Sequence, residues 1–203
     1  MKTNKTPAVF LAVIILVLFS CNRQKTNEPD LKRLNRWLNY YGLSLNHFTD
    51  TLKLKNNHSI KTGIDTSATH FKLYNDLYIY SHAKKYAVDL DSYSLVLEKN
   101  DEGKFVCYGT EADQEIALLK LMKLERQRIL FCGTACRAEE AQWVDNQTVF
   151  LLGFSQPQNV WMPTIWVYSP KESSLLEIKA NIQANKKPNS YNQAIRLNGI
   201  GFK

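Results

Sequence analysis

The sequence predicts a mainly β fold, an antiparallel β-meander preceded by one N-terminal amphipathic helix. From residue 70 onward, short runs of aromatic and aliphatic residues alternate with turn-forming residues, which is typical of antiparallel strands. One earlier segment, residues 31–41, has apolar residues at helical spacing instead. With 44% hydrophobic and 22% charged residues, the composition is that of a folded domain and excludes a disordered chain.

Residues 1–20 have the pattern of an export signal and are expected to lie outside the folded domain. Lys2 and Lys5 precede an unbroken apolar run, residues 8–19. As a helix this run would be about 18 Å long, whereas a spanning helix must cross roughly 30 Å of hydrocarbon. The run therefore predicts a removable signal peptide rather than a mature transmembrane anchor.

The end of this segment, Leu18 to Cys21, resembles the lipobox of bacterial lipoproteins, in which a small residue precedes an obligatory cysteine. Here Ser20 precedes Cys21. The resemblance implies a lipid on Cys21, a lipidated tether at residues 21–28, and attachment to the inner or outer membrane of a bacterial cell envelope. Two or more acyl chains are enough for stable anchoring. The alternative is an ordinary secretory signal in which Cys21 has no role.

Residues 29–203 are expected to form a single globular domain that begins with the helix. Its apolar stripe consists of Leu31, Leu34, Leu38 and Tyr41, with Trp37 beside it. Asn27 is a candidate N-cap, and Gly42 is a candidate left-handed residue at the C-terminal end. Three basic residues lie off the stripe: Lys32, Arg33 and Arg36. They form either a solvated face or a surface that rests on anionic phospholipid.

The remaining elements are predicted as short strands. They lie at residues 70–74, 77–80, 86–90, 93–97, 148–152, 164–168 and 175–178. The run Asn100 to Lys104 is a hairpin turn leading into a strand at Phe105. Residues 114–130 fit either a long helix or a hairpin, because Leu, Lys, Glu and Met favour helices while both ends of the segment have strand character. The hairpin is preferred because it completes a weak internal repeat.

That repeat relates residues 80–130 to residues 141–178, both of which fit the order strand, strand, hairpin, strand. The second copy resembles a blade of bacterial β-propellers of the TolB or WD40-like kind. In such blades a Trp, here Trp143, opens the blade, and a later strand carries an Ile-aromatic-Val core, here residues 165–167. The resemblance implies partial propeller-like blades within the meander. A generic meander without this kinship is the alternative.

No catalytic motif is present in the sequence. The four histidines form no H-E-x-x-H arrangement, and the chain has no Walker loop, nucleophile elbow or dinucleotide-binding glycine pattern. We therefore predict no catalytic residue, no metal site and no cofactor, and prefer a binding protein over an enzyme. Nucleic acid is excluded as a partner, because 26 basic against 19 acidic residues is a mild excess and the export signal separates the chain from it.

Cys132 and Cys136 form a C-x3-C pair with small residues between them. In an oxidising envelope compartment this spacing predicts a disulfide. Pairing with Cys107 and free thiols are the alternatives. If the cysteines are functional, the chain is instead an envelope thiol or metal-binding protein, or an enzyme, that uses Cys132 and Cys136.

The candidate partner-binding residues are aromatic and apolar. Val160, Trp161 and Met162 lie between two prolines in an otherwise polar loop, and Trp143 is a second candidate. The alternative is a loop that places its Trp beneath the sheet edge. Together with the anchor, these residues predict a non-enzymatic lipoprotein that binds an unknown envelope protein or glycan.

Two further charged segments are expected to be solvent-exposed. Glu139 and Glu140 are adjacent, and adjacent side chains of a strand point to opposite faces, so a solvated turn is preferred over a paired carboxylate site. After Glu177 the chain has no acidic residue. This tail is expected to be a solvated, partly mobile end, with contact to anionic lipid, glycan phosphate or an acidic protein as the alternative.

Overall fold

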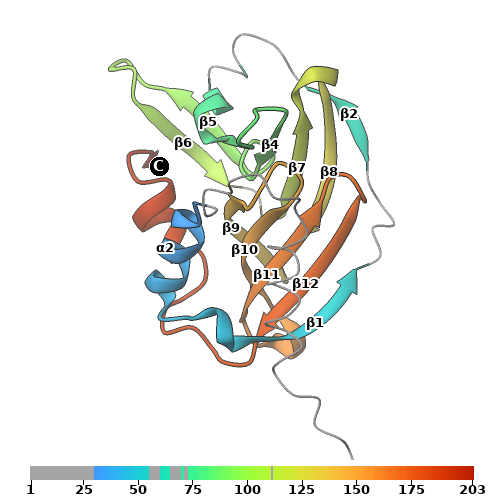
Figure 1. Cartoon of the computed structure of the whole chain (residues 1–203). Helices are drawn as coiled ribbons and strands as arrows, with labels where there is room; N and C mark the ends of the chain where they lie inside the picture. The colour runs from blue at the N-terminus through green and yellow to red at the C-terminus, as the bar shows by residue number, and fades with distance from the viewer. Residues whose placement is uncertain (1–29, 55–59, 65–69, 71–72, 111) are drawn as a thin grey trace, which may run out of the picture. The chain divides into compact units, whose positions relative to one another are not determined.

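A computed structural model of the chain describes residues 30–54, 60–64, 70, 73–110 and 112–203 (Figure 1). The expected signal peptide, Cys21 and the tether lie outside the described residues. No helix in the part of the chain that is described is long and apolar enough to cross a membrane.

The described chain is mainly β, as predicted, and its strands form three sheets. The first sheet has the order β1 (Phe48–Leu54), β12 (Ser174–Ala180), β11 (Met162–Ser169), β10 (Val149–Ser155), β9 (Cys136–Trp143). The second has the order β2 (Lys61–Gly63), β8 (Glu125–Cys132), β7 (Gln114–Lys120), β4 (Tyr86–Asp89), β3 (Ile79–Tyr80). The third has the order β13 (Gly201–Phe202), β6 (Phe105–Thr110), β5 (Leu95–Lys99). All pairings are antiparallel except that of β13 with β6.

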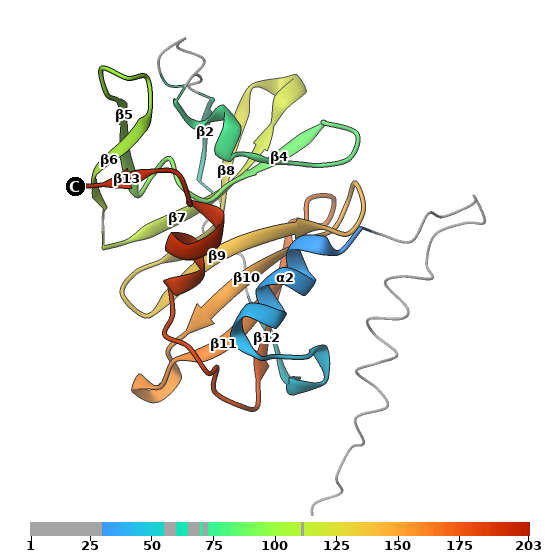
Figure 2. The same ribbon diagram turned by 90° about the vertical axis from the view of Figure 1, so that its left-hand side faces the viewer.

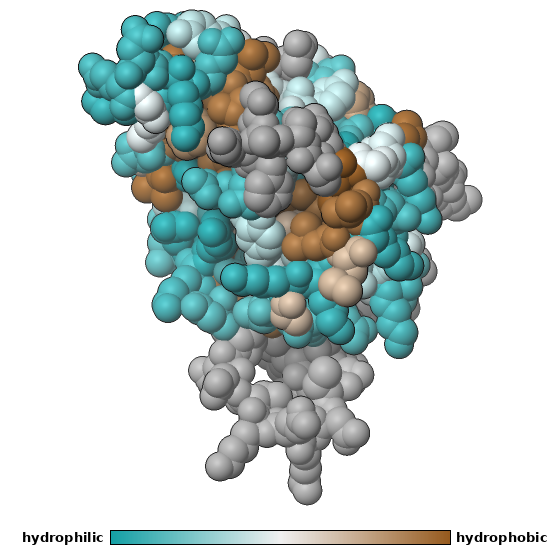
Figure 3. Space-filling view, turned by 90° about the horizontal axis from the view of Figure 1, so that it is seen from above, coloured by the Kyte–Doolittle hydropathy of each residue, from teal (hydrophilic) through white to brown (hydrophobic). Residues whose placement is uncertain are grey.

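Short helical segments connect the strands. They are η1 (Leu45–His47), η2 (Asn75–Leu77), η3 (Leu121–Lys123), η4 (Pro157–Asn159) and the π-helix η5 (Asn192–Arg196). The turn between β7 and β8, at the top of Figure 1, exposes Met122 and Leu124. Seen from above, hydrophobic residues interrupt an otherwise hydrophilic surface (Figure 3).

The predicted helix is α2 (Lys32–Tyr41), and its apolar stripe is buried as expected except for Leu31, which precedes the helix and is half-buried. Leu34, Trp37, Leu38 and Tyr41 face the protein interior. Gly42 follows the helix with φ of 67°, the left-handed conformation expected at a helix C-terminus. The N-terminal end differs from the prediction, because the N-cap is Leu31 and no side chain caps it. The candidate cap Asn27 lies outside the described residues.

Most predicted strands are present, and residues 114–130 form the predicted hairpin of β7 and β8. The strand expected at residues 70–74 is wrong, because His70, Leu73 and Tyr74 are helical. Tyr74 is buried and its hydroxyl donates to the Leu95 carbonyl at 2.6 Å. Packing of this aromatic side chain outweighs the strand preference of a short aromatic run.

The expected propeller-like blades are not confirmed. Propeller blades are four-stranded sheets arranged radially, whereas the sheets here have five, five and three strands. The first and second sheets instead share one core, which includes Val88, Ile116 and Leu118 from the second sheet and Trp143, Leu151 and Trp166 from the first. The other face of the first sheet packs against α2 (Figure 2).

The C-terminal tail packs against the domain, contrary to the expectation of a solvated end. Tyr191 and Leu197 are buried. The Arg196 guanidinium makes two 2.5 Å bonds to the Asp91 carboxylate, and its side chain is only 6% exposed. The last strand, β13, then pairs with β6. The tail is therefore a structural part of the domain.

Candidate functional site

A groove of about 500 Å³ lies between the β10–β11 loop and the chain segment 183–188. Its lining residues are Phe154, Asn159, Val160, Trp161, Gln183, Ala184, Asn185, Lys186, Lys187 and Pro188. Two of the three loop residues predicted to bind a partner, Val160 and Trp161, are therefore on a concave surface. Met162 is the first residue of β11 and is not among the lining residues.

The loop that carries Val160 and Trp161 has a sharply turned backbone. Gln158 and Asn159 both have positive φ, at 52° and 63°. This turn leaves Val160 40% exposed and Trp161 half-buried. The Trp161 side chain is thus neither free in solvent nor tucked completely beneath the sheet edge, and it can contribute contact area within the groove.

The floor and the opposite wall of the groove are held by α2. Phe154 is 1% exposed, and its ring centroid lies 4.9 Å from that of Tyr41. The Asn185 backbone N–H donates to the Tyr41 carbonyl at 3.4 Å. The Lys186 ammonium lies 3.6 Å from the centroid of the Tyr40 ring, within range of a cation–π interaction. The floor and this wall thus contact α2.

Trp143, the other predicted partner-binding residue, is in the core. It is 2% exposed, its indole N–H donates to the Ile79 carbonyl at 2.8 Å, and its ring stacks on Tyr86. The prediction that Trp143 binds a partner at the surface is therefore wrong. The sequence pattern around it indicated a strand correctly but could not distinguish the inner face from the outer one.

Glu139 and Glu140 are also buried, each 0% exposed, so the expectation of a solvated turn is wrong. In the register of β9 against β10, Glu140 pairs with Leu152 and Ala138 pairs with Gly153, which leaves Glu139 as the extra residue of a β-bulge. The bulge lets both carboxylates face α2. Gly153 permits this close approach, because a Cβ there would lie 2.0 Å from the Arg137 carbonyl oxygen.

The Glu139 carboxylate accepts hydrogen bonds from two parts of the chain that flank the groove. The Trp37 indole N–H donates at 2.9 Å and the Tyr41 hydroxyl at 3.0 Å. The Asn189 backbone N–H also donates to it. Burial raises the pKa of Glu139 to about 7, while these three hydrogen bonds lower it. Glu139 thus connects α2 to the segment that follows the groove wall.

Glu140 connects the same two parts of the chain. Arg33 donates to its carboxylate at 2.9 Å, Arg36 lies 3.5 Å away, and the Tyr191 hydroxyl donates at 3.0 Å. Burial raises the pKa of Tyr191, and the charge of Glu140 raises it further. The basic face of α2 is therefore partly engaged in the domain, with Arg33 41% and Arg36 52% exposed.

The sequence reasoning missed the role of this carboxylate pair. We name the pair, together with Trp37, Tyr41 and Tyr191, the carboxylate cluster. One signal for it was present: two acids stand within a stretch that otherwise fits a strand leading to Trp143. The groups that donate hydrogen bonds to Glu139 and Glu140 come from distant segments of the chain. The local sequence around the two acids therefore could not indicate that they are buried. The cluster supports the groove from behind and does not line it.

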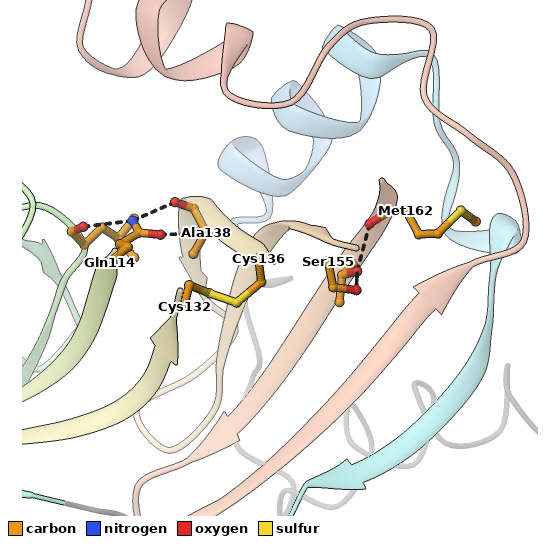
Figure 4. The surroundings of a disulfide bond; sticks show 8 residues. Gln114, Cys132, Cys136, Ala138, Ser155 and Met162 are labelled. Carbon is orange, nitrogen blue, oxygen red and sulfur yellow. Dashed lines mark hydrogen bonds between the residues drawn. A yellow bond between two sulfur atoms is a disulfide. The ribbon is translucent and has the colours of Figure 1, made fainter. Parts of the chain in front are cut away.

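The predicted disulfide between Cys132 and Cys136 is present (Figure 4), with the two Cα atoms 5.0 Å apart. It closes the turn from β8 to β9 and so links the second sheet to the first. Cys136 pairs with Ser155 at the base of the β10–β11 loop. The Ala135 carbonyl in the same turn accepts a 2.8 Å hydrogen bond from the Gln156 N–H.

The disulfide turn is further held by the side chain of Gln114. The Gln114 amide bonds to the Ala138 N–H and carbonyl, both at 2.9 Å. Cys107 is free and buried, and its thiol lies 3.0 Å from the Gly109 carbonyl. Across the described ranges, no three His, Cys, Asp or Glu side chains are grouped so that they could hold a metal ion.

Comparisons with protein-family models, with curated proteins and with solved structures give no match.

Proposed function

We propose that this chain is an exported bacterial lipoprotein that acts by binding a cell-envelope protein or glycan in the groove. The lipid on Cys21 attaches it to a membrane of the envelope. The observation that carries the binding proposal is the groove itself, where Val160 and Trp161 face the 183–188 segment. The order of residues 1–21, with its basic start, apolar run and Ser20-Cys21, supports the anchor.

The composition of the groove suits recognition better than chemistry. Its apolar and aromatic side chains provide contact area, and three amide side chains provide directed hydrogen bonds. Its lining residues have no carboxylate, imidazole, hydroxyl or thiol. The groups most used for general acid–base and nucleophilic catalysis are thus absent from this surface. Thiol chemistry at Cys132 and Cys136 receives no further support, because both sulfur atoms are joined in the disulfide.

Intact mass spectrometry of the protein purified from its native membrane, without reductant, tests the anchor. We expect a chain that begins at Cys21, heavier by a diacylglycerol and an acyl group and lighter by the two hydrogens lost in one disulfide. A chain that retains residues 1–20, with no added lipid, would contradict the proposed export and anchoring.

A Trp161→Ala variant tests the groove. Binding of isolated envelope proteins and glycans is compared between the wild-type lipoprotein and the variant. Tyr108→Ala is the matched control, because Tyr108 is an exposed aromatic residue on β6 of the third sheet. We expect loss of binding only for Trp161→Ala. Unchanged binding by a folded Trp161→Ala variant would exclude the groove as the binding surface.

A further inference from the structure

The groove has positive charge that is not balanced within its lining. The lining includes Lys186 and Lys187 and no acidic residue. The basic residues nearest to Lys186 and Lys187 along the chain have acidic partners: Lys179 pairs with Glu177 at 3.0 Å, and Arg196 pairs with Asp91. Lys187 is exposed, and its ammonium has no ion-pair partner among the described residues. A ligand with a negative group therefore gains an attraction at this edge of the groove.

The neutral part of the groove combines an aromatic ring with side-chain amides. Trp161 and Val160 form one wall, and the side chains of Asn159, Gln183 and Asn185 lie around the groove. Each amide both donates and accepts hydrogen bonds, as do the hydroxyls of a sugar ring. The flat apolar face of an indole suits the carbon-bound face of such a ring. No hydrogen bond within the described chain engages the side chains of Gln183 and Asn185.

The strand pairing argues against an extended peptide as the ligand. Peptides that bind sheets usually add a strand to a free edge. The two strands that lead into the groove loop, β10 and β11, are each paired on both sides. The N–H of Val160 is also taken, by the Pro157 carbonyl at 3.0 Å. The groove thus offers side-chain surface and little free backbone.

From these observations we infer that the groove binds an acidic saccharide. A sugar ring lies against Trp161, the amides bond to its hydroxyls, and a carboxylate or phosphate of the saccharide faces Lys187, with Lys186 beside it. This inference rests on the proposed binding function and names the class of ligand.

The test uses the full mature lipoprotein in detergent and calorimetric titration with four probes. Tetragalacturonate carries carboxylates, and a mannose tetramer phosphate carries phosphate. The methyl ester of tetragalacturonate is the neutral match, and hexaglutamate is the acidic peptide. Lys187→Gln removes the charge at the groove, while Lys171→Gln removes an exposed charge from the β11–β12 turn, at the opposite end of β11.

We expect at least one acidic saccharide to bind and the neutral ester to bind more weakly. Lys187→Gln should weaken binding about tenfold or more, the effect of one hydrogen bond to a charged group. Lys171→Gln should leave it unchanged. Added salt should weaken wild-type binding because the charges are exposed. Binding to only the carboxylated or only the phosphorylated probe would identify which negative group is recognised.

Four results would overturn the inference. The first is equal binding of tetragalacturonate and its ester. The second is no effect of Lys187→Gln on binding. The third is binding of hexaglutamate without either acidic saccharide. The fourth is no binding of any probe, while envelope material still binds in a Trp161-dependent way. In each case the proposed binding function stands if Trp161→Ala abolishes binding, and fails only if that variant behaves as wild type.

Discussion

Folding changes the protonation of the buried Glu139 carboxyl group in the range between acidic and neutral pH. Because burial raises its pKa from 4.5 to about 7, the folded chain binds this proton more tightly than the unfolded chain does. Stability from this group is therefore present in full below about pH 4.5 and declines as the pH rises to about 7. The pKa shift of Glu139 corresponds to about 3 kcal/mol of unfolding free energy.

We expect Glu139→Gln to remove this pH-dependent contribution. The wild-type chain should lose unfolding free energy between about pH 5 and pH 8, and the variant should lose less over that range. Urea denaturation of both proteins at the two pH values measures the difference. Parallel pH profiles for the two proteins would show that Glu139 does not titrate as inferred.

Gly153 is a second residue with a specific structural role. An added Cβ would lie 2.0 Å from the Arg137 carbonyl, so Gly153→Ala must displace the bulge of β9. We expect a loss of about 3 kcal/mol or more, as for severe overpacking. Gly109→Ala is the control, because a Cβ there meets nothing within 4 Å. Similar unfolding free energies for the two variants would argue against the tight bulge.

At the scale of elements, the disulfide turn supports both a sheet junction and the groove loop. Replacing Cys132 and Cys136 with Ser should lower the unfolding free energy by about 2 kcal/mol, the value for a loop this short. Because Ala135 and Cys136 contact the base of the β10–β11 loop, groove affinity should also fall. Ligand binding is measured by titration of the oxidised and the reduced wild-type protein. Equal affinity of the two forms would show that the disulfide does not support the groove.

Elements with a clear local period were predictable. The stripe of α2, the hairpin of β7 and β8, and the turn after Lys99 all follow from residue spacing and turn chemistry. The helical residues His70, Leu73 and Tyr74 were not predictable. A run of five residues is too short to distinguish a strand from a helical turn, and burial of Tyr74 favoured the helical turn.

At the scale of the whole molecule, two sheets depend on one core. Trp143 packs in that core and bonds to Ile79 of the second sheet. We expect Trp143→Ala to cost about 3 to 5 kcal/mol. Trp161→Ala, at a half-buried loop position, should cost much less. Urea unfolding of the two variants measures the difference. A comparable loss of unfolding free energy in both would contradict the assignment of Trp143 to the core and Trp161 to the groove surface.

Local sequence patterns were sufficient to predict the mainly β class, the buried face of α2 and the Cys132–Cys136 disulfide, and they pointed to Val160 and Trp161, which the structure places in the groove. These features depend on neighbours a few residues apart. Long-range packing, in contrast, places Trp143 in the core, buries Glu139 and Glu140, and makes residues 183–188 of the tail a wall of the groove. The bond from Trp37 to Glu139 joins residues 102 positions apart. One bulge residue in β9 reverses the face that local alternation assigns, and no local pattern encodes that pairing.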